Sequence, residues 1–385
     1  MPWEEVCLMD ARMSFLVQVN ESDESLAALC RRFGISRKTG YKWIERYETC
    51  GTSGLMDRRP LAHSHPERVP DALVDALVEV RKEHPFWGPK KILAWLQQHR
   101  PEQKWPAAST ISDRLKSHGL IRPRRRRLRV PMSLDPLASA DHPNETWCID
   151  FKGNFVLGDK TRCYPLTLTD QHTRYLLLCE AMNEPRFEPV QKYLTRAFRE
   201  FGMPARIRSD NGPPFASLGW GGLSRLSIWW LQLGIVPERI EPGKPQQNGR
   251  HERMHKTLKQ ETANPPAATP VEQQRLFDRF RGTYNDDRPH EALGQKTPAS
   301  RYASSPRAFP DTLRAPTYPE TMKLRRVDHS GRFAFFGVHT LTTTLAGQPV
   351  GLEPIDDDTW ELFYGPVLLG TLHVRNRKAR LDRAG

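Results

Sequence analysis

The sequence predicts a multidomain protein with α-helical units at its amino end, a mixed α/β core and a small all-β domain at its carboxyl end. Three patterns predict this fold class. Helix-break-helix patterns fill residues 1–121, apolar strands alternate with helical periods over residues 144–302, and apolar-polar alternation with regular glycines follows in residues 320–385. At about 150 residues per domain, a chain of 385 residues is long enough for two or three cores.

The balance of charge points to a polyanionic partner. Lys and Arg exceed Asp and Glu by 13, and basic side chains that neutralise phosphates drive nucleic-acid binding by releasing counterions. A membrane surface is the weaker alternative, because no apolar run approaches the ~20 residues of a bilayer span. Glu4, Glu5 and Asp10 are unlike a signal peptide, so we expect a cytoplasmic protein. The six cysteines have no C-x-x-C spacing and indicate neither a zinc ribbon nor a disulfide framework.

Residues 1–58 are predicted to form a helix-turn-helix domain. Within residues 24–47 an apolar helix, a Gly-Ile-Ser break and a second helix follow one another, with Ser36 able to cap the second helix and Trp43 in its buried stripe. The basic side chains left to face a DNA groove are Arg37, Lys38 and Lys42. The alternative is an ordinary helical hairpin with a solvated basic face.

A second helix-turn-helix-like domain is expected at residues 59–121, where three apolar stretches have helical spacing. A basic linker follows at residues 122–143. Its arginines repel one another, which favours an extended segment that phosphate contacts would stabilise; a merely solvated charge run is the alternative. The candidate DNA-binding residues of the linker are Arg122, Arg124, Arg125, Arg126, Arg127 and Arg129.

Residues 144–302 carry the pattern of the α/β core. Three consecutive strand-like runs, near residues 146–152, 163–169 and 175–181, predict an antiparallel meander. A five-stranded mixed sheet is expected to be completed by strands near 206–209 and 235–240, with helices near 188–201, 223–233, 247–262 and 270–284.

A linker rich in proline and serine is expected at residues 303–319. The segment that follows, residues 320–385, is predicted to form a small β-barrel of five or six strands. Its basic ends suggest contact with DNA or with another subunit, and simple packing on the core is the alternative.

Three carboxylates of the core lie where a divalent metal could be shared. Asp150 belongs to an apolar strand, Asp210 follows a short strand in an Asp-Asn-Gly turn, and Glu252 is in the first turns of a long polar helix. If the two strands are parallel neighbours, both aspartates emerge at the same sheet edge. Mg²⁺ and Mn²⁺ prefer oxygen ligands, and two such ions ~4 Å apart can activate a nucleophile and stabilise a leaving oxygen. The trio therefore predicts phosphodiester chemistry.

Other charged residues near these acids have different expected roles. Asp170 ends the second strand at the opposite sheet edge and is expected to cap the turn that follows. Lys256 and Lys259 share a helical face with Glu252, and Arg250 flanks it. We expect these three basic residues to contact DNA phosphates; an i,i+4 salt bridge is the alternative for the lysines.

Combined, these motifs resemble the integrase-core, DDE-type transposases of bacterial insertion sequences. The resemblance covers roughly residues 20–302. Its three signatures, and the two segments that follow the catalytic helix in that family, are matched by Trp147–Gly153, Arg208–Phe215, Pro245–Arg253, Tyr284–Gly294 and Thr297–Arg301.

The resemblance implies a fold and an activity. It implies an RNase-H-like core that holds two Mg²⁺ or Mn²⁺ ions on Asp150, Asp210 and Glu252, cleaves element ends, and directs a 3′-hydroxyl at target DNA without a covalent protein–DNA intermediate. The implied partners are double-stranded DNA, both terminal inverted repeats and target, and further copies of the chain assembled on that DNA. The implied location is the bacterial cytoplasm, at the nucleoid.

Two features depart from the pattern. Asp210 and Glu252 are separated by 41 residues, more than related integrases commonly have, and Gly219–Gly222 is interpreted as the extra loop. The zinc module that begins retroviral integrases is absent, so no zinc is expected. A DNA-binding regulator, or a nuclease that lacks strand transfer, is the competing hypothesis.

Overall fold

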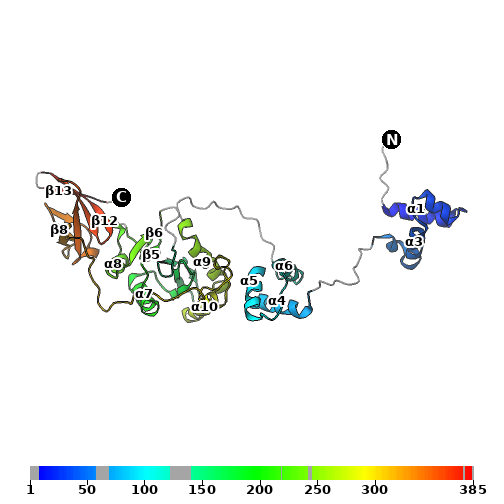
Figure 1. Ribbon diagram of the computed structural model, residues 1–385, viewed down its shortest axis with the longest axis horizontal. Coiled ribbons are helices and arrows are strands. Elements are labelled where there is room, and N and C mark those ends of the chain that lie inside the picture. The colour runs from blue at the N-terminus through cyan, green and yellow to red at the C-terminus, as the bar shows by residue number, and fades with distance from the viewer. Residues whose placement is uncertain are drawn as a thin grey trace. The chain divides into compact units, whose positions relative to one another are not determined.

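The computed structural model describes residues 8–57, 69–121, 140–217, 219–241, 245–375 and 378–383 (Figure 1). The chain divides into an amino-terminal unit that ends at Val69 and a larger unit that begins at Pro70, and each is described by itself. None of the helices in these ranges is long and apolar enough to cross a membrane. The arginines predicted to bind DNA between Arg122 and Arg129 lie outside the described residues.

The amino-terminal unit confirms the helix-turn-helix pattern. Its elements are α1 (Leu8–Glu21), α2 (Leu26–Arg32), α3 (Arg37–Cys50) and the short helix η1 (Gly51–Leu55). Ser36 caps α3, because its Oγ accepts a hydrogen bond from the backbone N–H of Thr39 at 3.1 Å. Trp43 is buried against Phe15 and Leu29, so the aromatic stripe of α3 faces the helices before it and leaves the basic residues of α3 outward.

A second three-helix cluster opens the larger unit. It consists of α4 (Asp71–Glu83), α5 (Pro89–His99) and α6 (Ala108–Ser117). Leu77, Trp87 and Ile111 are fully buried together between these helices. The apolar spacing seen in the sequence is therefore the inner face of this cluster.

The core that follows contains a mixed sheet. Its elements are β1 (Thr146–Phe151), β2 (Phe155–Val156), β3 (Arg162–Asp170), β4 (Leu176–Met182), α7 (Phe187–Phe201), β5 (Arg206–Ser209), α8 (Arg225–Gln232), β6 (Val236–Arg239), η3 (Pro245–Asn248), α9 (Gly249–Thr262) and α10 (Pro270–Gly282). Strands β1, β3 and β4 form the expected antiparallel meander, and β5 and β6 continue the sheet parallel to β1. The two-residue β2 pairs with β3 as a sixth, unpredicted strand.

Helices cover both faces of this sheet. Trp147 and Ile149 of β1 lie in one apolar cluster with α7 and α8, whereas Met254 of α9 and Phe277 of α10 lie in a second cluster on β3 and β4. Because side chains alternate along a strand, Cys148 and Asp150 lie on the opposite face of β1, which is covered by α9. The alternation thus directs Asp150 toward the helix that carries Glu252.

The carboxyl-terminal domain is all β, as predicted, but a closed barrel is not confirmed. Its strands are β7 (Lys323–Arg326), β8 (Arg332–Ala334), β9 (Val338–Thr340), β10 (Pro349–Pro354), β11 (Thr359–Tyr364), β12 (Val367–Arg375) and β13 (Lys378–Arg383). Five form an antiparallel sheet in the order β13-β12-β11-β10-β7. The β8–β9 hairpin lies at both sheet edges, since Arg325 Nε donates to Ala334 O at 3.1 Å and Ala379 N donates to Phe336 O at 2.9 Å. In the described part of the chain the hairpin, rather than a β7–β13 ladder, covers the apolar interior.

The β domain is anchored to the core by the loop that lengthens the spacing between Asp210 and Glu252. The short helix η2 (Trp220–Gly222) packs on β12, where a Cβ added at Gly370 would lie 3.2 Å from the Trp220 ring. The apolar interior of the β domain also continues into Ile228 and Leu231 of α8. The unusual loop length therefore has a structural role.

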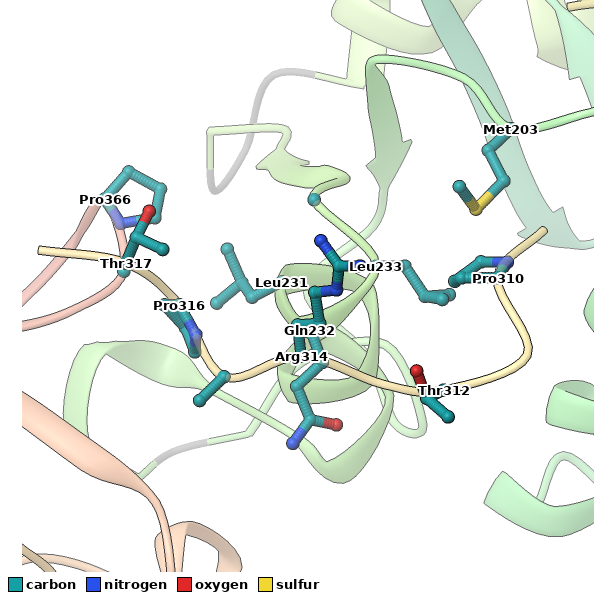
Figure 2. Close-up of a pocket in the computed structure, with 13 residues that line it drawn as sticks. Met203, Leu231, Gln232, Leu233, Pro310, Thr312, Arg314, Pro316, Thr317 and Pro366 are labelled. Atoms are coloured by element: carbon teal, nitrogen blue, oxygen red, sulfur yellow. The ribbon is translucent and has the colours of Figure 1, made fainter. Parts of the chain in front are cut away.

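Residues 302–309 pack on the core before the chain reaches the β domain. Tyr302 stacks on Tyr175 with ring centroids 4.3 Å apart, and Arg307 donates to the backbone oxygens of Leu233 and Gly234. Beyond them, an open cleft of about 720 Å³ lies between the carboxyl end of α8, residues 310–317 and Pro366 (Figure 2). Its lining includes none of the three candidate acids.

Candidate active site

The register of β1 and β5 places two of the three predicted acids at one edge of the sheet. The strands are parallel neighbours, with Cys148 opposite Arg208. Asp150 and Asp210 each lie two residues beyond this pair. The condition stated from the sequence, parallel and adjacent strands, is met.

The turn after β5 fixes the carboxylate of Asp210. The backbone N–H of Gly212 donates to Asp210 Oδ1 at 3.2 Å. A Cβ at position 212 would lie 3.1 Å from Asp210 Oδ2, closer than most Cβ contacts, so glycine leaves that oxygen room. Asn211 Nδ2 donates to Ile240 O at 2.7 Å and ties the turn to the chain after β6.

Helix α9 brings the third acid. Glu252 is exposed in its first turn, while His251, Met254 and His255 form the buried face. Lys256 lies one helical turn after Glu252 and is also exposed. The helix thus presents an acid and a basic residue outward while its other face packs on the sheet.

The electrostatics of Asp150 link it to both other acids. Burial is the largest cause that raises the pKa of Asp150 to about 7, and the negative charges of Asp210 and, to a smaller extent, of Glu252 contribute to that rise. Burial also raises the pKa of Asp210, although the N–H of Gly212 opposes that shift. Carboxylates close enough for their charges to raise the pKa of Asp150 form a site in which a cation would be strongly stabilised.

A buried Thr–His network lies beneath these acids and was not found from the sequence. It consists of Thr167 and Thr169 of β3 with His251 and His255 of α9, and it reaches Asp150, whose Oδ2 is 3.6 Å from His255 Nδ1. Burial lowers the pKa of His251 to about 3 and also lowers that of His255, so both imidazoles are neutral. The only signal in the sequence is the spacing of two histidines at i and i+4 around Glu252.

Asp170 has the structural role expected of it. The side chain is fully buried, and its Oδ1 accepts from the backbone N–H and the hydroxyl of Thr173 at 2.7 Å each. Its Oδ2 accepts from the backbone N–H of Asn144 at 2.7 Å. In the register it lies opposite Trp147, at the far end of β1 from Asp150.

The structure places the described basic candidates on the surface. Arg37, Lys38 and Lys42 are exposed on α3, and Lys256 and Lys259 are exposed on α9. Arg250 is exposed too and donates to Gln171 O at 3.4 Å.

The mixed sheet lies between two helix pairs, and acids from β1, from the end of β5 and from α9 lie at one of its edges. This is the arrangement of an integrase-type catalytic core. Family models described as "Integrase core domain" match residues 140–245 and 233–298. A "Helix-turn-helix domain" model matches residues 12–61, and a "Homeodomain-like domain" model matches residues 39–115.

Similar proteins come from insertion elements. An uncharacterized protein of insertion element IS407 from Burkholderia multivorans is 29% identical over 273 residues, which cover 70% of this chain and 94% of that protein. One of IS476 from Xanthomonas euvesicatoria is 27% identical, over 72% of this chain and 78% of that protein. A solved chain of a simian T-cell lymphotropic virus intasome aligns with a TM-score of 0.38 and 17% identity, covering 76% and 97% of the two chains.

Residues 140–298 match the integrase-core family, the chain is similar to proteins of two bacterial insertion elements, and it is a transposase. It is a polynucleotidyl transferase that carries helix-turn-helix domains ahead of its catalytic core. Members of this family use divalent metal ions.

Proposed function

We propose that Asp150, Asp210 and Glu252 together hold two Mg²⁺ or Mn²⁺ ions and catalyse cleavage at the ends of an insertion element, followed by strand transfer into target DNA. The observation that carries this is the position of Asp150, whose pKa is raised to about 7 by burial and by Asp210. An oxygen-binding cation suits such a site, since it would replace the proton and neutralise the neighbouring carboxylates.

The reaction consists of two displacements at phosphorus. In the first, a water oxygen bonds to phosphorus while the bond to the 3′-oxygen breaks, which leaves a 3′-hydroxyl at the element end. In the second, that hydroxyl attacks a target phosphodiester, and the target's own 3′-oxygen departs with the proton. Bound ions would polarise the attacked phosphate and favour the ionised nucleophile. The carboxylates would hold the ions, and the edge of the sheet holds the carboxylates in position.

The basic surfaces supply the contacts with DNA in this proposal. Lys256 and Lys259 lie on the outward face of α9 with Glu252, where phosphates next to the reacting bond would pass. Arg250 flanks the same acid. Arg37, Lys38 and Lys42 of α3 read the terminal repeats. The basic segment of residues 122–143 supplies further contacts with phosphates. Copies of the chain assemble on the paired element ends.

The division of labour follows the domain boundaries expected from the sequence. Residues 1–58 and 59–121 bind element ends, residues 144–302 catalyse, and the β domain from residue 320 contacts DNA or another subunit. Residues 122–143 and 303–319 connect these parts.

Strand transfer by the purified protein tests the proposal. With labelled oligonucleotides that carry the element's own termini and Mg²⁺ or Mn²⁺, wild-type protein is expected to form strand-transfer products. Asp210→Asn should lose these products by at least about 100-fold while it still binds the ends. Asp286→Asn, which makes the same change at an exposed site, is the matched control. Cleavage without strand transfer would indicate a nuclease, and unchanged activity in Asp210→Asn would rule out the metal role of that residue.

A further inference from the structure

We propose that the buried Thr–His network positions helix α9 against strand β1 and thereby sets the spacing between Asp150 and Glu252. Thr167 is the central residue of this network. The inference rests on the proposed function, because it concerns the site where these acids would share metal ions. It assigns a positioning role to residues that do not themselves contact the reacting atoms.

The hydroxyl of Thr167 joins three elements. Its Oγ1 lies 2.7 Å from Nε2 of His251 and 2.7 Å from Nε2 of His255, both on α9, and 3.2 Å from the backbone oxygen of Asp150 on β1. Thr167 is also the register partner of Asp150 across the β1–β3 ladder. One fully buried hydroxyl on β3 therefore contacts both the strand of the first acid and the helix of the third.

One assignment of hydrogens satisfies every hydrogen bond of Thr167 and His251. A threonine hydroxyl offers one proton and two lone pairs. If Thr167 donates to Asp150 O, it accepts from both Nε2–H groups, and His251 Nδ1 then accepts from the Thr169 hydroxyl at 2.9 Å. His255 Nδ1 keeps a free lone pair 3.6 Å from Asp150 Oδ2. This tautomer is assigned from the network.

The same assignment argues against a metal site made of the histidines. One ligand atom each of Asp150, His251 and His255 lies within 4.8 Å of the others, which alone would suit a cation. However, Thr167 and Thr169 occupy both ring nitrogens of His251. One of the three members of this cluster therefore has no nitrogen free for a cation, and His251 belongs to the support of the site rather than to its ligands.

The sequence positions of the histidines explain how the support acts. His251 directly precedes Glu252, and His255 follows one turn later. Two hydrogen bonds to the same buried oxygen, one turn apart, fix both the rotation and the sliding of α9 on the sheet. Supporting hydrogen bonds of this kind typically change metal affinity by about 10- to 100-fold when they are removed.

The test is Mn²⁺ binding to the full chain, measured by calorimetry and by the electron paramagnetic resonance of free ion. Thr167→Val keeps the shape of the side chain but leaves two imidazole N–H groups unpaired, so Mn²⁺ affinity is expected to fall about 10- to 100-fold. Thr167→Ser keeps the hydroxyl and should restore most of that affinity. The rates of strand transfer by wild type, Thr167→Ser and Thr167→Val should fall in the same order as their Mn²⁺ affinities. The change should appear in kcat rather than in KM.

Thr146→Val is the matched control. Thr146 is also a buried threonine of this sheet, but its Oγ1 has no hydrogen-bond partner within the described ranges. The same replacement there should leave Mn²⁺ affinity within about twofold of wild type.

A second pair of variants covers the case in which Thr167→Val does not fold. His255→Gln retains an N–H near the position of Nε2 and is expected to bind Mn²⁺ more tightly than His255→Leu. Equal affinities of Thr167→Val and wild type, or of the two His255 variants, would overturn the positioning role. Two other results would overturn the proposed metal site and the inference with it. One is wild-type protein that binds no Mn²⁺, and the other is an Asp150→Asn variant that binds Mn²⁺ as tightly as wild type does.

Discussion

Asp150 shows how folding and chemistry compete at a single residue. Only 22% of its side chain is exposed, and Asp210 adds a second negative charge nearby. The raised pKa measures the free-energy cost of holding an ionised carboxylate there without a counter-ion. An active site that binds cations tolerates this cost, and replacing the acid should recover it.

We expect Asp150→Asn to stabilise the metal-free protein, and more so at high pH. The pKa of Asp150, about 7, lies above the ordinary value of 3.8, so the folded state binds the proton more tightly. The stability contributed by wild-type Asp150 therefore falls as pH rises between these two values. The advantage of the variant should be larger at pH 8 than at pH 5 by roughly 1–3 kcal/mol.

Urea unfolding in the presence of a chelator measures this difference. Asp286→Asn, which makes the same change at an exposed position, is the control. An Asp150→Asn variant that is destabilised at pH 8, or whose advantage shrinks as pH rises, would contradict the assigned electrostatics.

The sequence predicted the acids better than their support, for a physical reason. Asp150 and Asp210 each belong to local patterns, an acid in an apolar strand and an acid in a turn, and these patterns are visible within a few residues. Thr167 and His251 are 84 positions apart, and they meet only because β3 pairs with β1 and α9 packs on the same face. No local pattern marks such a pair.

Helix α9 combines two functions on opposite faces. Its inward face, which includes His251 and Leu258, is buried against β3 and the neighbouring helix. Its outward face carries Glu252, Lys256 and Lys259, all exposed. The sequence predicted the helix and this outward face, but it did not predict that buried polar groups, as well as apolar ones, hold the inward face.

We expect Lys256→Ala and Lys259→Ala each to weaken binding to element ends and to lower the slope of log affinity against log salt by about one unit. Each variant would remove one of the proposed contacts to a phosphate. Fluorescence anisotropy over a range of salt concentrations measures the slope. Lys192→Ala, at an exposed position of α7 across the sheet, is the control. Slopes equal to wild type would indicate that these lysines are solvated charges.

At the scale of the whole molecule, the order of helical, α/β and all-β parts could be predicted from the sequence. Whether the carboxyl-terminal β domain closes into a barrel could not. Alternation of apolar residues identified β strands after residue 320, yet it cannot show which strands pair at the edges, because edge pairing depends on contacts distant in sequence. The loop at Gly219–Gly222 was interpreted from the sequence as an addition, while its packing on β12 became apparent only in the fold.

The central claim is that Asp150, Asp210 and Glu252 bind the metal ions of a transposase. The most direct measurement is anomalous scattering from crystals of the full chain with element-end DNA and Mn²⁺. We expect two peaks ~4 Å apart, each in contact with Asp150 and one of the other two acids. Mn²⁺ bound away from these carboxylates, or no Mn²⁺ at all in an active complex, would contradict the account.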